Sequence, residues 1–341
     1  MNSDTPSAKP TAHEIAAWLI AAAALSLVLM LHLLPALLAG LLVHELVHIL
    51  APRLGVTRLG RTPAKLAAIA LLSTAVVALL TLAVYGSVAF FRSDIGSLPA
   101  LMQKMAEIIE GARAMLPDWI TASLPNSADA LANSMAHWLR EHAGEVQIIG
   151  KEAGRGIVHI LFGVVIGAMI SLHEAAPPGE RRPLWQALIE RAARLALAFR
   201  RIVFAQVRIA ALNAFFTWLY LDVTLPMLGI HLPLAKTLVA VTFVVGLLPV
   251  IGNLVSNTVI VVVSLSQSIQ VALASLVFLV VIHKLEYFLN ARIVGSRISA
   301  RSWELLLAML TMEAAFGVPG LVAAPIYYAY LKDELACRGQ V

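Results

Sequence analysis

Long apolar runs with almost no charge recur along this chain of 341 residues, and they limit its fold more than any other feature. The first covers about residues 15–31 and the second about residues 33–50. An α-helix needs roughly 20 apolar residues to cross a bilayer, whereas the strands of a membrane barrel show short alternating segments. Only 13% of the residues are charged, too few to cover the surface of a soluble protein. We therefore expect an all-α, polytopic membrane protein.

About eight transmembrane or re-entrant segments divide the chain into four parts. After the first two, they cover residues 64–91, 156–173, 202–222, 234–266, 269–289 and 303–331. The expected parts are a three-helix unit at 1–91, external amphipathic helices at 92–155, a fourth span with a basic interfacial helix at 156–201, and a C-terminal transmembrane core at 202–341. Two apolar helical faces in the external part, within 98–109 and 131–139, can lie on the outer leaflet, form a cap or pack on neighbouring helices.

Basic residues flank these segments in a pattern that sets the orientation. Lysine and arginine are abundant in residues 52–65, 174–201 and 290–302, whereas residues 92–155 carry mixed charges. Short loops rich in Lys and Arg stay in the cytoplasm, so the N-terminus is predicted to be cytoplasmic. The arginines of 174–201 suit anionic lipid headgroups, so membrane lipid is the expected partner of these side chains. We do not expect the chain to bind nucleic acid.

A short motif, His44-Glu45-Leu46-Val47-His48, allows a second interpretation. Two imidazoles one helical turn apart can chelate zinc, with Glu45 as general base, as in an intramembrane metalloprotease. Zinc needs a third protein ligand, and no later segment offers a recognisable one. In the alternative interpretation, His44 and His48 meet lipid headgroups at the cytoplasmic end of their helix. Cys337 is the only cysteine, which excludes a cysteine-based metal site, and we expect no cofactor.

Glycine and proline interrupt two of the apolar segments. Gly246-Leu247-Leu248-Pro249-Val250-Ile251-Gly252-Asn253 interrupts residues 234–266, and Phe316-Gly317-Val318-Pro319-Gly320 interrupts residues 303–331. Backbone groups freed by such breaks are costly in hydrocarbon unless protein or water meets them. Paired breaks therefore indicate a transporter binding site, with 234–266 as a re-entrant hairpin and 303–331 as a kinked span or a second hairpin. Ordinary proline kinks are the alternative.

Polar residues lie close to both breaks. A buried Arg208 in the fifth span would need a partner, either Glu286 or Glu313. Ionisable groups at membrane depth mark a transport pathway or a structural ion pair. We expect the solute or ion pathway to include Arg208, Asn213, Pro249, Gly252, Asn253, Asn257, His283, Glu286, Asn290, Glu313, Gly317 and Pro319.

The C-terminal half resembles the autoinducer-2 exporter family of bacterial permeases. The resemblance rests on Leu247-Leu248-Pro249-Val250-Ile251-Gly252, Leu285-Glu286-Tyr287-Phe288-Leu289-Asn290, Ile293-Val294-Gly295, and the run from Phe316 to Gly320 with Pro325 and Tyr328. It implies a homo-oligomeric transporter of the bacterial inner membrane that exports small signalling or metabolic solutes, with some relatives linked to sodium–proton exchange. The pair Gly163 and Gly167, spaced for close helix packing, is a weaker indication of self-association.

These observations favour a permease without enzymatic chemistry that moves a small solute or signalling molecule, with H⁺ or Na⁺ as coupling ion. The chain has no G-x-x-x-x-G-K-[ST] motif for ATP. Two alternatives stay open: the intramembrane zinc metalloprotease, and an oligomeric membrane scaffold that transports nothing.

Overall fold

The computed structural model describes residues 10–55, 61–92, 103, 128–173, 182–248, 251–265, 267–293 and 302–338. Every regular element in these ranges is helical. The chain forms two compact units, which we describe separately. Unit 1 contains residues 1–80, 152–203 and 297–341, and unit 2 contains residues 81–151 and 204–296.

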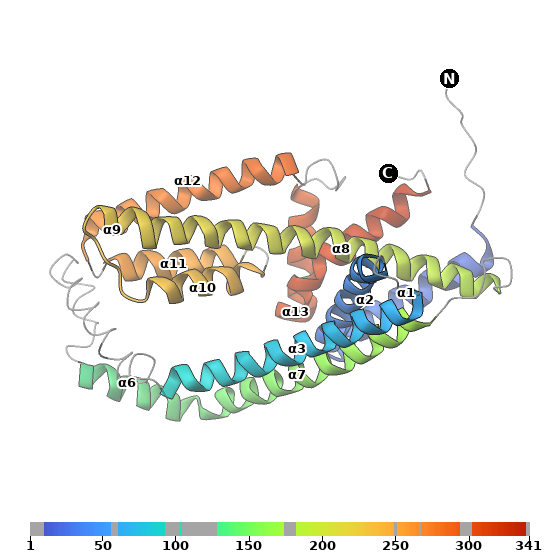
Figure 1. Cartoon of the computed structure of the whole chain (residues 1–341), viewed down its shortest axis with the longest axis horizontal. Helices are drawn as coiled ribbons and strands as arrows, with labels where there is room; N and C mark the ends of the chain where they lie inside the picture. The colour runs from blue at the N-terminus through green and yellow to red at the C-terminus, as the bar shows by residue number, and fades with distance from the viewer. Residues whose placement is uncertain are drawn as a thin grey trace, which may run out of the picture. The chain divides into compact units, whose positions relative to one another are not determined.

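The helices follow one another along the chain without intervening strands in the described ranges (Figure 1). They are α1 (Ala12–Met30), α2 (Leu34–Gly55), α3 (Arg61–Arg92), α6 (Ala128–Glu141), α7 (Ala143–Leu172), α8 (Pro183–Trp218), the π-helix η2 (Leu219–Thr224), α9 (Leu225–Met227), α10 (Ala235–Gly246), α11 (Ile251–Leu265), α12 (Ile269–Ile293) and α13 (Ser302–Ala336).

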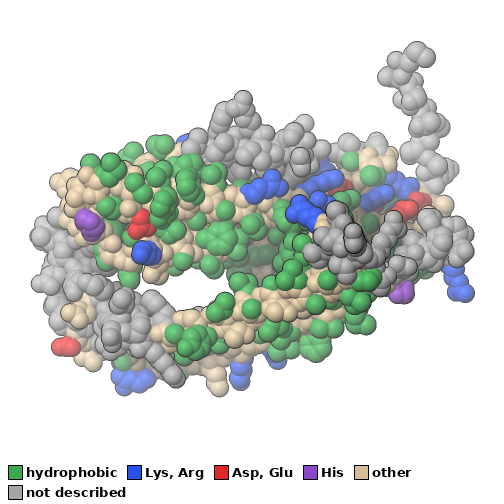
Figure 2. Space-filling view, in the orientation of Figure 1, with side chains coloured by type: hydrophobic (Ala, Val, Ile, Leu, Met, Phe, Trp, Pro, Cys, Tyr) green, Lys and Arg blue, Asp and Glu red, His purple; other side chains and the backbone are tan. Residues whose placement is uncertain are grey.

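Six of the described helical stretches are long and apolar enough to cross a membrane. They are Ala12–Met30, Leu34–Arg53, Pro63–Gly86, Ala143–Leu172, Pro183–Met227 and Trp303–Ala336. Large apolar side chains such as Leu79 and Met169 are exposed on these helices, and Figure 2 shows hydrophobic side chains over much of the visible surface. A surface of this kind suits lipid, and the predicted class of all-α polytopic membrane protein is confirmed.

Local sequence sets the start of the first two helices. Thr11 caps α1: its hydroxyl oxygen accepts from the N–H of Glu14 at 3.3 Å, and the Glu14 carboxylate accepts from the N–H of Thr11 at 2.8 Å. This reciprocal capping box satisfies two donors that the first turn leaves free. A tight turn with His32 at φ 57° then leads into α2, where Pro35 occupies the first turn of the helix.

Two helices extend beyond the predicted segments. α7 begins at Ala143, inside the part predicted to be external, and α8 continues from Pro183 to Trp218. The predicted interfacial helix and the fifth span are therefore one helix, because no glycine or proline follows Pro183 to interrupt it. α6 confirms a helix over 131–139, while residues 98–102 and 104–109 lie outside the described ranges; the four-part division stays a prediction.

Small residues bring the backbones of α2 and α7 together inside unit 1. A Cβ atom on Gly163 would lie 2.8 Å from the Cα of Ala36, and one on Gly167 would lie 2.8 Å from the Cα of Gly40. The glycine pair is thus used within the chain, in a helix contact of the small-xxx-small kind. As a result, it is no longer an indication of self-association.

Acidic residues of α13 and α2 contact the arginines of α8 in unit 1. Arg194 Nη1 lies 2.6 Å from a Glu334 carboxylate oxygen, and Arg201 Nη1 lies 2.9 Å from Asp333. Arg200 Nε lies 3.8 Å from Glu45. Protein carboxylates therefore already contact three of the arginines that were expected to suit lipid headgroups, and the expectation for lipid stays a prediction.

The close approach of α2 and α7 predicts opposite effects for one substitution at two glycines of α7. Gly167→Ala should lower the free energy of unfolding by about 1–3 kcal/mol, because the added methyl group meets the backbone of Gly40. Gly156→Ala is the matched control: its Cβ would meet nothing within 4 Å, and a more stable helix, by up to about 1 kcal/mol, is expected. Thermal unfolding in detergent measures both; equal effects would contradict the contact.

Candidate functional site

The first predicted break is a helical hairpin in unit 2. α10 has 12 residues and α11 has 15, which corresponds to about 18 and 22 Å of helix, less than the roughly 30 Å of a bilayer core. Gly252 lets the chain return closely, because a Cβ there would lie 2.8 Å from the Cα of Gly246. Pro249 lies outside the described residues. A continuous helix over 234–266 is thus excluded.

Two amide side chains of α8 hold the hairpin on either side of its tip. Gln206 Nε2 donates to the carbonyl oxygen of Gly246, the last residue of α10, at 2.8 Å. Asn213 Nδ2 donates to Asn253 Oδ1, near the start of α11, at 3.2 Å. Because Gln206 and Asn213 are seven residues apart, they lie on one face of α8. The break therefore has backbone and side-chain partners within the protein.

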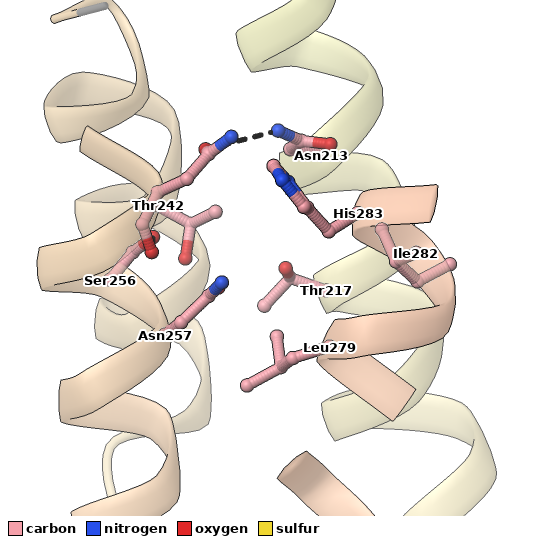
Figure 3. A pocket seen from close by; sticks show the side chains of 9 residues that line it. Asn213, Thr217, Thr242, Ser256, Asn257, Leu279, Ile282 and His283 are labelled. Carbon is pink, nitrogen blue, oxygen red and sulfur yellow. Dashed lines mark hydrogen bonds between the residues drawn. The ribbon is translucent and has the colours of Figure 1, made fainter. Parts of the chain in front are cut away.

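A polar pocket lies behind this tip, between α8, α10, α11 and α12 (Figure 3). Its empty volume is about 280 Å³, part of which is open to the surroundings. In Figure 3, Thr217 of α8 and Asn257 of α11 point toward one another across it. The lining residues are Asn213, Thr217, Thr242, Asn253, Ser256, Asn257, Leu279, Ile282 and His283.

A distorted turn and a buried hydrogen-bond chain fix the end of α8 near this pocket. Pro226 cannot donate to a carbonyl one turn back, and the preceding turn is widened into the π-helix η2. Tyr220 of η2 stacks on Phe278 with ring centroids 4.0 Å apart, and its hydroxyl bonds Ser275 at 3.0 Å. Ser275 in turn bonds Ser264 at 2.7 Å, so α11 and α12 are held to the end of α8.

Four predicted pathway side chains meet at the pocket, namely Asn213, Asn253, Asn257 and His283. Arg208 is exposed and donates its Nε to the carbonyl of Phe204 in its own helix. Glu286 and Asn290 belong to α12, but their side chains lie outside the description, so the predicted ion pair of Arg208 with Glu286 stays a prediction. The alternative partner Glu313 belongs to unit 1, and its pairing with Arg208 stays a prediction as well.

Sequence reasoning missed Gln206, Thr217, Thr242 and Ser256. The spacing of Gln206, Asn213 and Thr217 along one face of α8 was the available signal. Thr242 and Ser256 gave none, because a single hydroxyl in an apolar helix usually bonds its own backbone.

The second predicted break is also a hairpin, formed by α13 in unit 1. Lys332 Nζ lies 2.6 Å from a Glu304 carboxylate oxygen, although a straight helix would place residues that far apart in sequence about 42 Å from each other. The chain turns back at Gly317, which has φ 64° and ψ −147°, a conformation that glycine adopts without strain (Figure 1). Pro319 and the exposed Glu313 lie near this turn. The chain therefore turns back on itself at Gly317, and re-entry into the membrane at this place stays a prediction.

The histidine motif of α2 lies in unit 1. His44 Nδ1 is 3.2 Å from Ser171 Oγ, and His48 Nδ1 donates to the carbonyl of His44 at 2.8 Å. Glu45 is buried and pairs with Arg200. Across the described residues, no group of three or more His, Cys, Asp or Glu side chains could hold a metal ion. No third zinc ligand is therefore found in this part of the chain.

Comparison with known proteins identifies the family. The model described as AI-2E family transporter matches residues 14–336, and the chain belongs to this family. No curated protein and no solved structure matches it. The resemblance found in the sequence is confirmed, and the family supports a membrane permease.

The contact at the hairpin tip gives a second prediction. Gln206→Leu should lower the free energy of unfolding by about 1–3 kcal/mol, because the Gly246 carbonyl loses its side-chain donor. Gln186→Leu, at an exposed position of the same helix, is the control and should leave the unfolding temperature nearly unchanged. If thermal unfolding in detergent gave the same result for both variants, the capping role of Gln206 would be wrong.

Proposed function

We propose that this AI-2E family member is a permease of the bacterial inner membrane that moves a small solute or signalling molecule, with flux coupled to H⁺ or Na⁺. The observation that carries this proposal is the α10–α11 hairpin, whose two short apolar helices turn back beside a pocket lined by polar side chains. Irregular backbone at membrane depth is tolerated where it is buried in protein or lines a wet cavity, and transporters use such places for binding.

The two hairpins support a specific membrane topology. With a cytoplasmic N-terminus, the helices α1, α2, α3, α7, α8 and α12 cross in alternation, which places the basic segments 52–65, 174–201 and 290–302 inside. The α10–α11 hairpin then enters from the outside, and α13 enters from the cytoplasm and returns to it. Arg338, past the end of α13, pairs with Glu14 at the start of α1, which agrees with both ends of the chain lying on one side.

The proposed pathway also includes residues that are assigned to it only because of their positions along the helices. Glu286 and Asn290 follow His283 along α12 by one and two turns, and Glu313 lies one turn before Gly317. A carboxylate at these places could exchange a proton during transport. The proposal keeps the homo-oligomer that the resemblance implies; its contacts would use faces other than Gly163 and Gly167, which α2 covers.

The topology predicts where single cysteines react. Native Cys337 is exposed and should be labelled by a membrane-impermeant maleimide only from the cytoplasmic side. In a Cys337→Ser background, Met227→Cys and Gln270→Cys, at the two ends of the α8-to-α12 connection, should both be labelled from the outside. Labelling of these two positions from opposite sides would show that the segment from α10 to α11 crosses the membrane once instead of re-entering.

Flux through proteoliposomes tests the proposed function itself. With autoinducer-2 as the probe solute, the wild type should carry it across the bilayer, and Asn257→Leu should reduce the rate at least about tenfold by filling the polar pocket. Glu286→Gln and Asn290→Ala are expected to reduce it likewise.

The matched control is Val259→Leu, which changes an exposed position of the same helix and should transport at the wild-type rate. Each variant is first checked for a normal unfolding temperature, so that misfolding is not read as lost transport. Wild-type rates in all three pathway variants would show that the pathway is assigned to the wrong residues. If the wild type moved neither this probe nor Na⁺ nor H⁺, the permease proposal would fail.

A further inference from the structure

The two histidines of α2 lie side by side in unit 1 and have no part in the proposed pathway. The ring centroids of His44 and His48 are 4.2 Å apart, and the ring planes are tilted by 50°. His48 is exposed and His44 is partly buried. A ligand from the surroundings can therefore reach the pair from the side of His48.

Hydrogen bonds determine which nitrogen of each neutral ring carries the proton. His48 Nδ1 lies 2.8 Å from the carbonyl oxygen of His44, which can only accept. His44 Nδ1 lies 3.2 Å from Ser171 Oγ, and the single hydrogen of that hydroxyl is used on the carbonyl of Gly167 at 2.7 Å. Nδ1 is thus the donor in both neutral rings, and the Nε2 atom of each ring keeps an unshared electron pair.

Neither Nε2 atom has a hydrogen-bond partner among the described residues, because every polar contact of the two rings there uses Nδ1. Histidines that bind metals have this arrangement: the other ring nitrogen donates to a protein oxygen, which fixes the tautomer and the ring. A single helical histidine can also bond its own helix without any metal, as His142 does with the Trp138 carbonyl at 2.9 Å. The informative feature is therefore the adjacent pair.

The separation of the two rings narrows the class of metal. With metal–nitrogen bonds of about 2.0–2.1 Å, two imidazoles at a right angle on one ion have ring centroids about 4.5 Å apart, against about 5.2 Å at a tetrahedral angle. The observed 4.2 Å is closer to the right angle. Right angles are typical of square-planar or octahedral ions such as Cu²⁺ and Ni²⁺, which imidazole also binds well.

The charged groups around the pair limit what a bound ion can do. Glu45 is paired with Arg200 at 3.8 Å, and within the described part of the chain no third His, Cys, Asp or Glu joins the two histidines. Lys65 of α3 interacts electrostatically with His44 and disfavours a second positive charge. We therefore expect micromolar or weaker binding, without the three protein ligands of a catalytic zinc site.

We propose that His44 and His48 bind a divalent copper or nickel ion through their Nε2 atoms, with water in the remaining positions. The site lies near the end of α2 that the proposed topology places on the cytoplasmic side. Because His44 also contacts Ser171 of α7, a bound ion stabilises the packing of α2 on α7. The site is separate from the proposed pathway, and metal binding does not depend on transport.

Titration of Ni²⁺ into the purified full-length protein, without a polyhistidine tag, tests this site. The wild type should bind Ni²⁺ saturably, and its unfolding temperature should rise with Ni²⁺, since a ligand of the folded state stabilises that state. His44→Ala and His48→Ala should each weaken binding at least about tenfold, because one imidazole alone cannot chelate. An excess of Mg²⁺, which prefers oxygen ligands, should not compete.

Electron paramagnetic resonance of bound Cu²⁺ counts the nitrogen ligands directly. The spectrum should show two nitrogen ligands in the wild type and one in either histidine variant. His142→Ala is the matched control: it removes a histidine with the same bond to its own helix, but with a tryptophan one turn earlier, so this variant should bind Ni²⁺ like the wild type. Unfolding temperatures without metal show that each variant folds.

Three results would each overturn the metal site. They are no saturable Ni²⁺ binding by the wild type, unchanged binding by both His44→Ala and His48→Ala, and equal weakening by His142→Ala. Since no solute is present in these measurements, their outcome leaves the permease proposal as it stands.

Discussion

Backbone amide and carbonyl groups must find partners wherever water is excluded, and the whole architecture depends on this constraint. Long helices satisfy it internally, which is why apolar runs dominate the chain. The two hairpins satisfy it differently. At the α10–α11 tip, Gln206 supplies a donor to the Gly246 carbonyl. The break is therefore supported by a side chain from another helix, and the same helix supplies Asn213 and Thr217 to the pocket behind it.

Glycines decide where backbones come close enough for this arrangement. Gly252 allows the hairpin to close tightly, and Gly167 allows α7 to lie against Gly40. Gly317 contributes a positive φ rather than space, since a Cβ there would meet nothing within 4 Å. Glycine thus has two distinct structural uses at these three positions, and only the local geometry tells them apart.

The sequence allowed the fold class and both breaks to be predicted, because hydrophobic runs and Gly/Pro interruptions are local signals. It also led to Asn213, Asn253, Asn257 and His283, since amide and imidazole groups are rare in apolar helices. Thr242 and Ser256 could not be predicted, because only the packing of α10 and α11 on α8 brings them to one pocket.

Contacts between residues that are far apart in the sequence could not be predicted either. The arginines of α8 have a lipid-binding pattern when read alone, and their carboxylate partners Asp333 and Glu334 lie more than a hundred residues further along. The continuity of α8 is hard to predict for a related reason: its polar half and its apolar half differ in composition, and such a change in composition is also typical of a boundary between two helices. A hydrophobic pattern describes which face a helix buries, whereas charge partners depend on tertiary structure.

The contacts of α1 with the end of α13 bear on how the protein is made. Trp18 donates to Glu334 at 3.2 Å, and Arg338 lies over the Trp18 ring at 4.7 Å while it pairs with Glu14. Because α1 precedes α13 in the chain, it receives these partners only after α13 has been made. Until then, the buried Arg191 of α8 also lacks the nearby carboxylate of Glu334. Unit 1 can therefore reach its final packing only after α13 has been inserted, so assembly of this part is a late step in the folding of the chain.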